Sequence, residues 1–193
     1  NPTYFTVEAS DKLYVQLPSG SKDAYYTRDI LWVKGSLNGE TIHVYVNHWP
    51  SRVGGEKSSE PGRMAAAAVC RNHIDGILEK DPNAKIIVMG DLNDDPTDKS
   101  VEKILRADSK EGLNKQGTLF NPWLELYRNG IGTLAYQDAW GLFDQIIISK
   151  PWLNRDQTGF FFYQPHVFNK PKLKRHFNSL FKIYSLVEIV LIE

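Results

Sequence analysis

The segment that decides the fold runs from Lys85 to Asp95 and reads Lys-Ile-Ile-Val-Met-Gly-Asp-Leu-Asn-Asp-Asp. A short apolar run that ends at Gly90 is typical of a buried strand. The strand leads directly into polar residues, and period-two alternation predicts that Asp91 and Asn93 project on one side of the turn. A carboxylate there can hold a cation or orient a water molecule, and a carboxamide can donate to and accept from a phosphate group.

Two other interpretations of this segment compete with a phosphate site. Asp91 and Asn93 could simply cap a helix that starts near Thr97. The pattern Asp-x-Asn-x-Asp that begins at Asp91, with Glu102 following, also has the ligand spacing of a calcium-binding loop. Pro96 disfavours the calcium loop, because proline cannot take the positive φ that the loop needs there and the preceding segment is a strand. On the pattern alone, the capping interpretation stays open.

A strand pair is predicted upstream of this segment. Residues 29–36 and 40–48 flank Asn38-Gly39, which is the strongest short hairpin signal. Along the second run Ile42, Val44 and Val46 alternate with His43, Tyr45 and Asn47. This alternation predicts a strand pair with one buried face.

Helix signals separate the strand signals. Apolar residues at helical spacing predict a helix over 58–80, with Pro61 in its first turn. A second helix is predicted over 97–106, directly after Pro96. Residues 146–148 predict another buried strand. This order favours a layered α/β or α+β fold whose active groups lie on loops at strand ends.

Length and composition limit the classes of function. The 193 residues fit one domain over 1–193, and 23 Lys+Arg balance 23 Asp+Glu, so no overall charge indicates a nucleic acid or membrane partner. The single cysteine, Cys70, excludes an internal disulfide framework and a cysteine-rich zinc module. No apolar stretch approaches the ~18 residues of a membrane span, and no secretory signal is recognised, which leaves the compartment undetermined.

The last third of the chain differs in character from the rest. Residues 157–187 hold five Lys/Arg, no Asp or Glu and eight aromatic residues. One interpretation is a nucleic-acid surface, with cations for phosphates and rings for base stacking. The other is a half-buried strand region with a solvated basic loop, which is the commoner use of such a run.

Two further segments carry candidate chemistry. In residues 46–52, His48 comes at the end of a predicted strand, just before Pro50 stops it. A histidine there can bond a phosphate oxygen or donate a proton, although a structural histidine is the alternative. In residues 132–149, Asp144 precedes the buried strand, and Tyr136 and Trp140 could wall or stack on a substrate. Otherwise these residues are a strand cap and a packed aromatic pair.

Together the three segments resemble the endonuclease/exonuclease/phosphatase family, whose members hydrolyse phosphodiesters and phosphomonoesters with a divalent cation. His48 matches the family's His-x-Pro element, Asp91 and Asn93 match its Gly-Asp-x-Asn signature, and Asp144 matches the aspartate that opens the next core strand. The resemblance covers residues 28 to about 149. It implies a four-layer sandwich of two β-sheets face to face with helices outside.

The resemblance also implies roles for these residues. Asp91 would orient the nucleophilic water, His48 and Asn93 would hold the phosphate, and Asp144 would support them. Mg²⁺ or Mn²⁺ would be bound by Asp91 and Asn93, and Arg28 lies where family nucleases often carry a phosphate-contacting arginine.

The chain departs from the family pattern at both ends. It lacks the early strand followed by a metal-anchoring glutamate, and it lacks the final Ser-Asp-His. We therefore expect the C-terminal part of a family domain with an altered tail. An incomplete sandwich exposes apolar strand surface, which favours self-association or completion by a missing segment.

Two functions of different class follow. The first is divalent-metal-dependent hydrolysis of a phosphoester, and the alternative is a catalytically incomplete module that binds a phosphate or a protein. The sequence does not choose among nucleic acid, a lipid headgroup, an inositol phosphate and a nucleotide as substrate. A zinc site from Cys70 and His73 is a third option that lacks a second pair of ligands.

Overall fold

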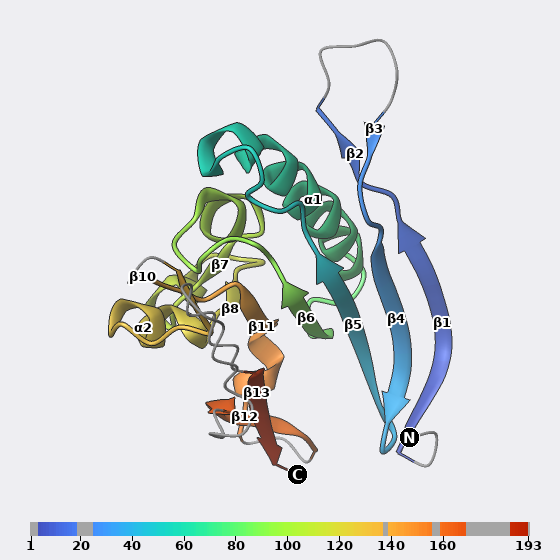
Figure 1. Cartoon of the computed structure of the whole chain (residues 1–193). Coiled ribbons are helices and arrows are strands. Elements are labelled where there is room, and N and C mark those ends of the chain that lie inside the picture. The colour runs from blue at the N-terminus through green and yellow to red at the C-terminus, as the bar shows by residue number, and fades with distance from the viewer. Residues whose placement is uncertain (1–3, 19–24, 137–138, 156–158, 169–185, 193) are drawn as a thin grey trace.

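The computed structural model describes residues 4–18, 25–136, 139–155, 159–168 and 186–192. A seven-stranded sheet forms its centre, in the order β1-β4-β5-β6-β11-β8-β7 (Figure 1). Its strands are β1 (Phe5–Leu13), β4 (Ile30–Leu37), β5 (Glu40–His48), β6 (Lys85–Asp91), β7 (Ala107–Asp108), β8 (Leu119–Phe120) and β11 (Asp144–Ile148). Further pairs join β2 (Gln16–Leu17) to β3 (Tyr25–Tyr26), β9 (Leu134–Tyr136) to β10 (Ala139–Gly141), and β12 (Phe161–Phe168) to β13 (Leu186–Ile192).

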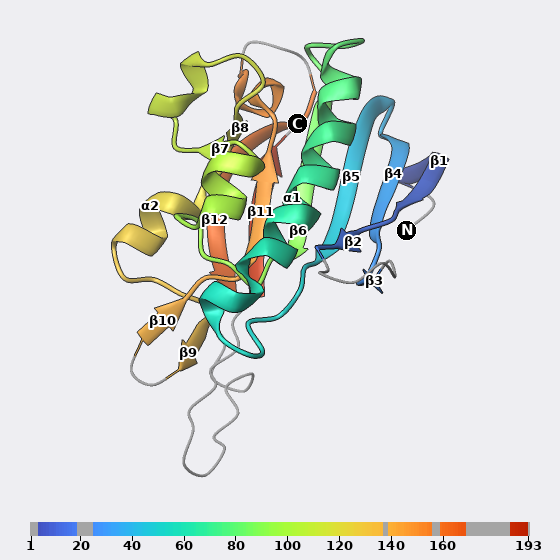
Figure 2. The ribbon, with the colours of Figure 1, turned by 90° about the horizontal axis from the view of Figure 1, so that it is seen from above.

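Helical segments connect the strands. The α-helices are α1 (Glu56–Leu78) and α2 (Trp123–Arg128). A π-helical turn, η1 (Ser100–Ile104), and two 3₁₀ turns, η2 (Glu111–Asn114) and η3 (Lys150–Leu153), lie in the second half of the chain. Figure 2 shows α1 lying across one face of the sheet.

The predicted hairpin is confirmed. β4 and β5 are antiparallel, with Leu37 opposite Glu40, and Asn38 and Gly39 turn the chain at φ of 48° and 90°. These left-handed angles are the ones that a tight hairpin turn requires and that Asn and Gly tolerate best. The predicted strand at 85–90 is also confirmed as β6, which pairs in parallel with β5. A parallel pair needs a crossover, and α1 provides it.

The predicted helix over 58–80 is confirmed as α1, but its start is earlier. Gly54 and Gly55 complete the preceding loop at φ of 85° and 111°, so the helix can begin at Glu56, whose carboxylate is favoured by the helix dipole. Pro61 therefore lies inside the helix and not in its first turn. The placement of Pro61 at the helix start is corrected accordingly.

The helix predicted over 97–106 is wrong in type and extent. The structure has the single turn η1, closed by a bond from the Leu105 amide to the Ser100 carbonyl at 2.9 Å. The Ser100 hydroxyl donates to the carboxylate of Asp94 at 2.6 Å. Side-chain bonds of Ser and Asp compete with a regular helical ladder, which explains why a full helix does not form here.

The two faces of the sheet are covered differently. α1 packs its small and aliphatic side chains, among them Ala67, Cys70 and Ile74, against Tyr45 and Ile86. On the opposite face a second core joins Ile42, Phe120 and Ile148 of the sheet to Trp152 of η3 and Phe162 of β12. The layered α+β fold with a large central sheet is thereby confirmed.

The prediction that β5 buries one face holds along the second half of the strand, but not at its start, where Ile42 and His43 are both buried. Ile42 is buried, but Val44 is half-buried and Val46 is exposed, whereas His43, Tyr45 and Asn47 are buried. The reason is that α1 covers the face that carries the polar residues. β12 and β13 contribute to the core around Ile42 and leave Val46 exposed. Whether the chain self-associates stays a prediction.

Among the helices of the described ranges, none combines the length and the apolar character that crossing a membrane requires.

Two histidines between the sheet and α1 predict how stability depends on pH. His73 Nδ1 lies 2.7 Å from the Tyr45 hydroxyl, and His43 stacks on Trp32 with ring centroids 5.8 Å apart. Burial lowers the pKa of both histidines, and for His43 the charge of Lys34 lowers it further. In the unfolded chain both histidines therefore bind protons near pH 6.5, whereas in the folded chain they bind them only at lower pH. The stability that is present above pH 6.5 is lost as the pH falls below this value.

We expect the free energy of unfolding to fall between pH 7.5 and pH 5.5, by at most about 1.4 kcal/mol per pH unit for each histidine. Urea denaturation at the two pH values measures this difference. Buried Asp94, whose pKa burial raises to about 6, changes stability in the opposite direction, so the test compares the wild type with His43→Gln/His73→Gln. An unchanged pH dependence in the double variant would contradict the prediction.

Candidate active site

Three strand ends bring predicted site residues into one row. His48 at the end of β5 lies opposite Asp91 at the end of β6, and Asp91 lies opposite Asp144 at the start of β11. Directly opposed residues on neighbouring strands project from the same face of a sheet, with Cβ atoms about 5 Å apart. We call His48, Asp91 and Asp144 the polar row. It lies in the middle of the sheet at one end of its strands (Figure 1), on the face opposite α1.

Gly90 allows β5 and β6 to come together beside the row. It has φ of 130°, and a Cβ atom added there would lie 2.0 Å from the carbonyl oxygen of Asn47. A side chain at this position would force the two strands apart. The close approach of the strands that brings His48 beside Asp91 thus requires a glycine at position 90.

The polar row is accessible, and its members lie close together. His48 Nε2 lies 3.8 Å from Asp91 Oδ2, and the two side chains are 54% and 38% exposed. Asp144 is half-buried, and burial raises the pKa of its carboxyl, as does the negative charge of Asp91. A 3.4 Å bond from the Thr133 hydroxyl and the nearby His48 lower it in part. The carboxylates of Asp91 and Asp144 are close enough to repel each other, and a cation bound beside them would relieve this repulsion.

Asn93 reaches the row by a turn and not by strand alternation. It has a left-handed φ of 51°, and its amide N–H donates to Asp91 Oδ1 at 2.9 Å. Its side-chain Nδ2 donates to the Trp49 carbonyl at 2.9 Å. The expected juxtaposition of Asp91 and Asn93 is found, although its cause differs from the predicted one. Asp91 accepts from this turn, and η1 has no side-chain cap bond, so the helix-capping interpretation does not describe the structure.

Arg28 lies directly behind the row. Its Nε donates to the His48 carbonyl at 3.0 Å, and its NH2 group donates to the Trp49 carbonyl at 2.9 Å. Arg28 and Asn93 therefore both donate to the Trp49 carbonyl. The structure places Arg28 next to the predicted site as a brace of the His48 backbone.

The two aromatic candidates lie on a hairpin that begins beside Asp144. Tyr136 is in β9 and Trp140 is in β10, where Trp140 pairs with Ala135 and is 42% exposed. Thr133, which precedes β9, donates to Asp144. The Tyr136 side chain lies outside the described part of the structure. Trp140 is thus exposed on a segment attached to the row, as a substrate-stacking residue would be.

Sequence reasoning missed Arg52, which connects the parts of the site. Its Nε donates to the Asn93 carbonyl at 2.8 Å, its NH2 group pairs with Asp98 at 2.7 Å, and its guanidinium lies 4.5 Å from the ring centroid of Phe143. Because Phe143 precedes Asp144, Arg52 joins the turn after Asp91 to the start of β11. Its partners Asn93 and Asp98 lie 41 and 46 positions away in the sequence, so local spacing does not signal this link.

Buried polar residues extend this support below the site. Asp95 Oδ1 accepts from the Leu142 amide at 2.6 Å, and Gln145 Nε2 donates to the Asp94 carbonyl at 2.8 Å. Arg63, 1% exposed, pairs with Asp94 at 2.6 Å between Nε and Oδ1. The turn that follows Asp91 is therefore held to the start of β11 by hydrogen bonds and to α1 by an ion pair.

The donors of the site fit a hard cation that keeps most of its waters. Such an ion takes carboxylate and amide oxygens, often from only one or two carboxylates plus the phosphate of a substrate. Asp91 offers a carboxylate and Asn93 offers its amide oxygen, since the amide nitrogen serves the Trp49 carbonyl. Within the described ranges no three His, Cys, Asp or Glu side chains are arranged to enclose a metal ion.

The zinc alternative does not fit the structure. Cys70 is fully buried in α1, and burial raises the pKa of its thiol to about 12. His73 lies at hydrogen-bond distance from the Tyr45 hydroxyl. Neither side chain is available as a zinc ligand in this arrangement.

Comparison with known proteins decides the family. The model of the endonuclease/exonuclease/phosphatase family matches residues 1–184. The chain belongs to this family. The family is one of hydrolytic phosphoesterases, and the polar row coincides with the motifs by which the sequence resembled it. No curated protein sequence matches the chain significantly.

Solved structures share the fold of this family member at low sequence identity. A mannosyl-6-phosphatase of Bacteroides thetaiotaomicron superposes with a TM-score of 0.62 at 15% identity, over 99% of this chain and 68% of that one. The human Nocturnin catalytic domain with bound sulfate gives 0.59 at 17%, over 97% and 61%. TDP2 of D. rerio, complexed with a single-strand DNA product, gives 0.57 at 14%, over 96% and 69%. The chain thus spans about two thirds of the length of these structures.

Proposed function

We propose that the chain hydrolyses a phosphoester at the polar row in a reaction that depends on a divalent cation. The observation that carries the proposal is the register of three adjacent strands, which sets His48, Asp91 and Asp144 side by side on an accessible face. These are the residues by which the sequence resembled the family. The names of the structural neighbours, a phosphatase and two proteins solved with sulfate or a DNA product, support the same chemistry.

Each residue of the site has a role in hydrolysis that follows from the chemistry of its side chain. Asp91 accepts a proton from, and orients, the attacking water, and its position is fixed by the Asn93 amide N–H on its other oxygen. His48, more than half exposed, donates to a phosphate oxygen. Asn93 contacts the phosphate or the cation, and Asp144 supports these residues from the far side of Asp91. Mg²⁺ or Mn²⁺ held by Asp91 and Asn93 would neutralise charge that develops on the phosphoryl oxygens.

Residues that surround the polar row bind the part of the substrate that does not react. Trp140, exposed on the hairpin beside Asp144, stacks on a ring of the substrate. We place Tyr136 in the same role by its position in the hairpin. Arg28 adds positive charge behind His48, where it favours an anionic group.

Removal of the cation is expected to abolish turnover. With bis(p-nitrophenyl) phosphate as substrate, EDTA should reduce hydrolysis to the background rate, and excess Mg²⁺ or Mn²⁺ should restore it, because the carboxylates alone cannot stabilise the added charge of the transition state. Calorimetric titration with Mg²⁺ gives an independent measurement, and Asp91→Asn should lose this binding while Asp81→Asn, remote from the row, retains it. Hydrolysis that persists at full rate in EDTA would contradict the proposal.

The alternative is a module that binds phosphate without turnover. The observation that favours it is the absence of a three-residue metal cluster from the described residues. The two functions differ in a simple assay. The module would bind inorganic phosphate without added cation and would show no Mg²⁺-stimulated hydrolysis, whereas the enzyme shows stimulation that Asp91→Asn removes.

A further inference from the structure

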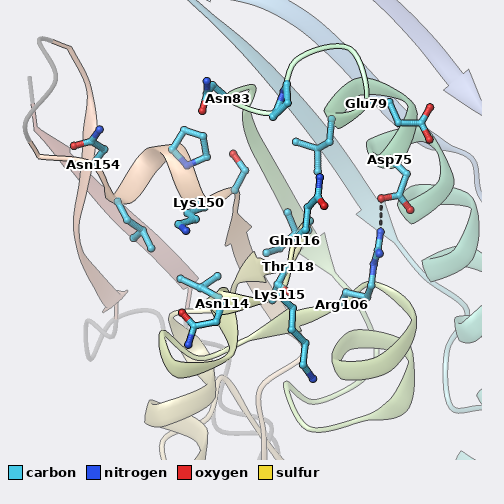
Figure 3. A pocket seen from close by; sticks show the side chains of 18 residues that line it. Asp75, Glu79, Asn83, Arg106, Asn114, Lys115, Gln116, Thr118, Lys150 and Asn154 are labelled. Carbon is cyan, nitrogen blue, oxygen red and sulfur yellow. Dashed lines mark hydrogen bonds and ion pairs between the residues drawn. The ribbon is translucent and has the colours of Figure 1, made fainter.

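Two adjoining hollows lie at the end of the molecule where β6 begins and β11 ends. The first has a volume of about 1000 Å³ and is bordered by the end of α1, the 113–119 segment and η3 (Figure 3). The second, of about 510 Å³, continues from it towards β12. Leu113, Asn114, Lys150 and Leu153 line both hollows, so the two form one groove. We call it the distal groove.

The distal groove is separate from the polar row. Asn83, which precedes β6, and Ser149, which follows β11, line the first hollow, whereas Asp91 ends β6 and Asp144 begins β11. The six residue steps of β6, at roughly 3.3 Å each, put about 20 Å between the two places. A molecule bound in the distal groove therefore does not occupy the site proposed for hydrolysis.

The charges that line the distal groove are mainly positive. Lys110, Lys150 and Arg155 line the second hollow, and no carboxylate is among its described lining residues. The first hollow adds Lys115 and Arg106. The chain as a whole has zero net charge, so this excess is local. A local excess of cations in a neutral protein indicates an anionic ligand.

The acidic residues of the first hollow do not cancel this excess. Asp75 pairs with Arg106 (Figure 3) and also with Arg71, which is 4% exposed, so its charge is already matched twice. Glu79 points away from the groove in Figure 3. Lys150, the first residue of η3, extends into the space between η3 and the 113–118 segment in the same view. Among the described residues no carboxylate forms an ion pair with Lys150, so within this part of the chain its charge in the groove is not compensated by a direct partner.

The walls of the distal groove are held in place before any ligand binds. The Arg71 guanidinium donates to the Gly117 carbonyl at 2.9 Å, and the Ser149 hydroxyl donates to the Ala84 carbonyl at 2.7 Å. In the second hollow, Lys110 lies over the ring of Phe120 and Arg155 over the ring of Phe161, with 5.9 and 5.7 Å to the ring centroids. A preformed wall lowers the entropy lost when a ligand binds.

Aromatic surface accompanies the cations. Tyr163 of β12 lines the second hollow and is 47% exposed, while its neighbour Phe162 is buried beneath it. Both belong to the basic, aromatic run 157–187 that the sequence singled out, of which residues 169–185 lie outside the described structure. Cations for phosphates beside an exposed ring for a base form the combination that single-stranded nucleic acids bind.

We propose that the distal groove binds single-stranded nucleic acid at a site separate from the polar row. Apart from Arg106, which pairs with Asp75, four cations line the groove, and they exceed what one monoanion or dianion neutralises, which favours a ligand with several phosphates. Tyr163 stacks on one base, and Lys150 and Arg155 contact the adjacent phosphates. This second site holds a strand independently of whether the polar row cleaves it.

Fluorescence anisotropy with labelled dT10 in EDTA tests the proposal without involving catalysis. The wild type should bind with a log–log salt slope of about −2, as expected for three phosphate contacts to a single strand. Lys150→Glu/Arg155→Glu should weaken binding about tenfold or more and flatten this slope. The control Lys12→Glu/Lys57→Glu makes the same change of charge away from the groove and should leave the affinity within about twofold.

Stacking is tested separately with Tyr163→Ala, which should weaken dT10 binding about fivefold or more and leave the binding of polyphosphate unchanged. Hydrolysis of bis(p-nitrophenyl) phosphate by these variants should equal that of the wild type, so failure of the groove and failure of the proposed catalysis are distinguishable. Equal weakening by the two double variants would overturn the proposal in favour of overall charge. Polyphosphate binding as tight as that of dT10 would overturn it in favour of a general polyanion site.

Discussion

The Asp91→Asn variant is expected to lose about 10³-fold or more in kcat/KM for phosphoester hydrolysis. Asp91 is the central member of the polar row, opposed by His48 on β5 and by Asp144 on β11. A carboxamide has nearly the same shape but cannot accept a proton from water and carries no charge for a cation. Removing a group that acts in the transition state characteristically lowers kcat by two to three or more orders of magnitude.

The substitution is suited to the test because it leaves the fold unchanged. The Asn93 amide donates to Asp91 Oδ1, and the carbonyl oxygen of an asparagine accepts the same bond. Urea denaturation of the variant should therefore give a free energy of unfolding close to that of the wild type. Asp81→Asn, an exposed aspartate before β6, is the matched control and should keep full activity. An Asp91→Asn protein that folds and hydrolyses at the wild-type rate would remove the polar row from the mechanism.

Much of this site is visible in the sequence because its position follows from local patterns. The Asn38-Gly39 turn fixes the β4–β5 register, and the apolar run before Gly90 marks a central strand. Polar residues that follow buried strands gather at a sheet edge, so motifs far apart in the chain can be expected to meet there. The register that places His48 beside Asp91 agrees with this expectation.

Other features of the structure were not predicted from the sequence, most of them because they depend on tertiary contacts. β1 was not predicted, although Phe5, Val7 and Ala9 alternate with polar residues; most of its residues are exposed in the structure. The sequence did not specify which face of β5 is buried, because that depends on the side of the sheet that α1 covers. Arg52 serves residues 41 to 46 positions away, and no local spacing reports such partners. The distal groove likewise arises from segments that only the folded chain brings together.

The buried charges below the site lead to the largest expected effect on stability. Asp94 and Arg63 are 2% and 1% exposed and pair at 2.6 Å, while Ser100 donates to the other oxygen of Asp94 at 2.6 Å. Asp94→Ala should lower the free energy of unfolding by about 3–5 kcal/mol, because it leaves the Arg63 guanidinium buried without its counter-charge. Arginine cannot escape this penalty by losing its proton. Urea denaturation measures the loss.

A double variant separates the effect of the unpaired Arg63 charge from the effect of lost packing. Arg63→Met/Asp94→Leu removes both charges and keeps apolar volume, so it should recover at least about half of the stability that Asp94→Ala loses. Glu8→Ala, which breaks the exposed pair with Lys34, is the control and should cost less than about 1 kcal/mol. If the single and double variants are equally destabilised, the buried charge is not the cause. Because the Asp94 carboxylate also pairs with Arg52 at 3.2 Å, and Arg52 donates to the Asn93 carbonyl, a double variant that regains stability but not activity would show that this network positions the polar row as well as stabilising the fold.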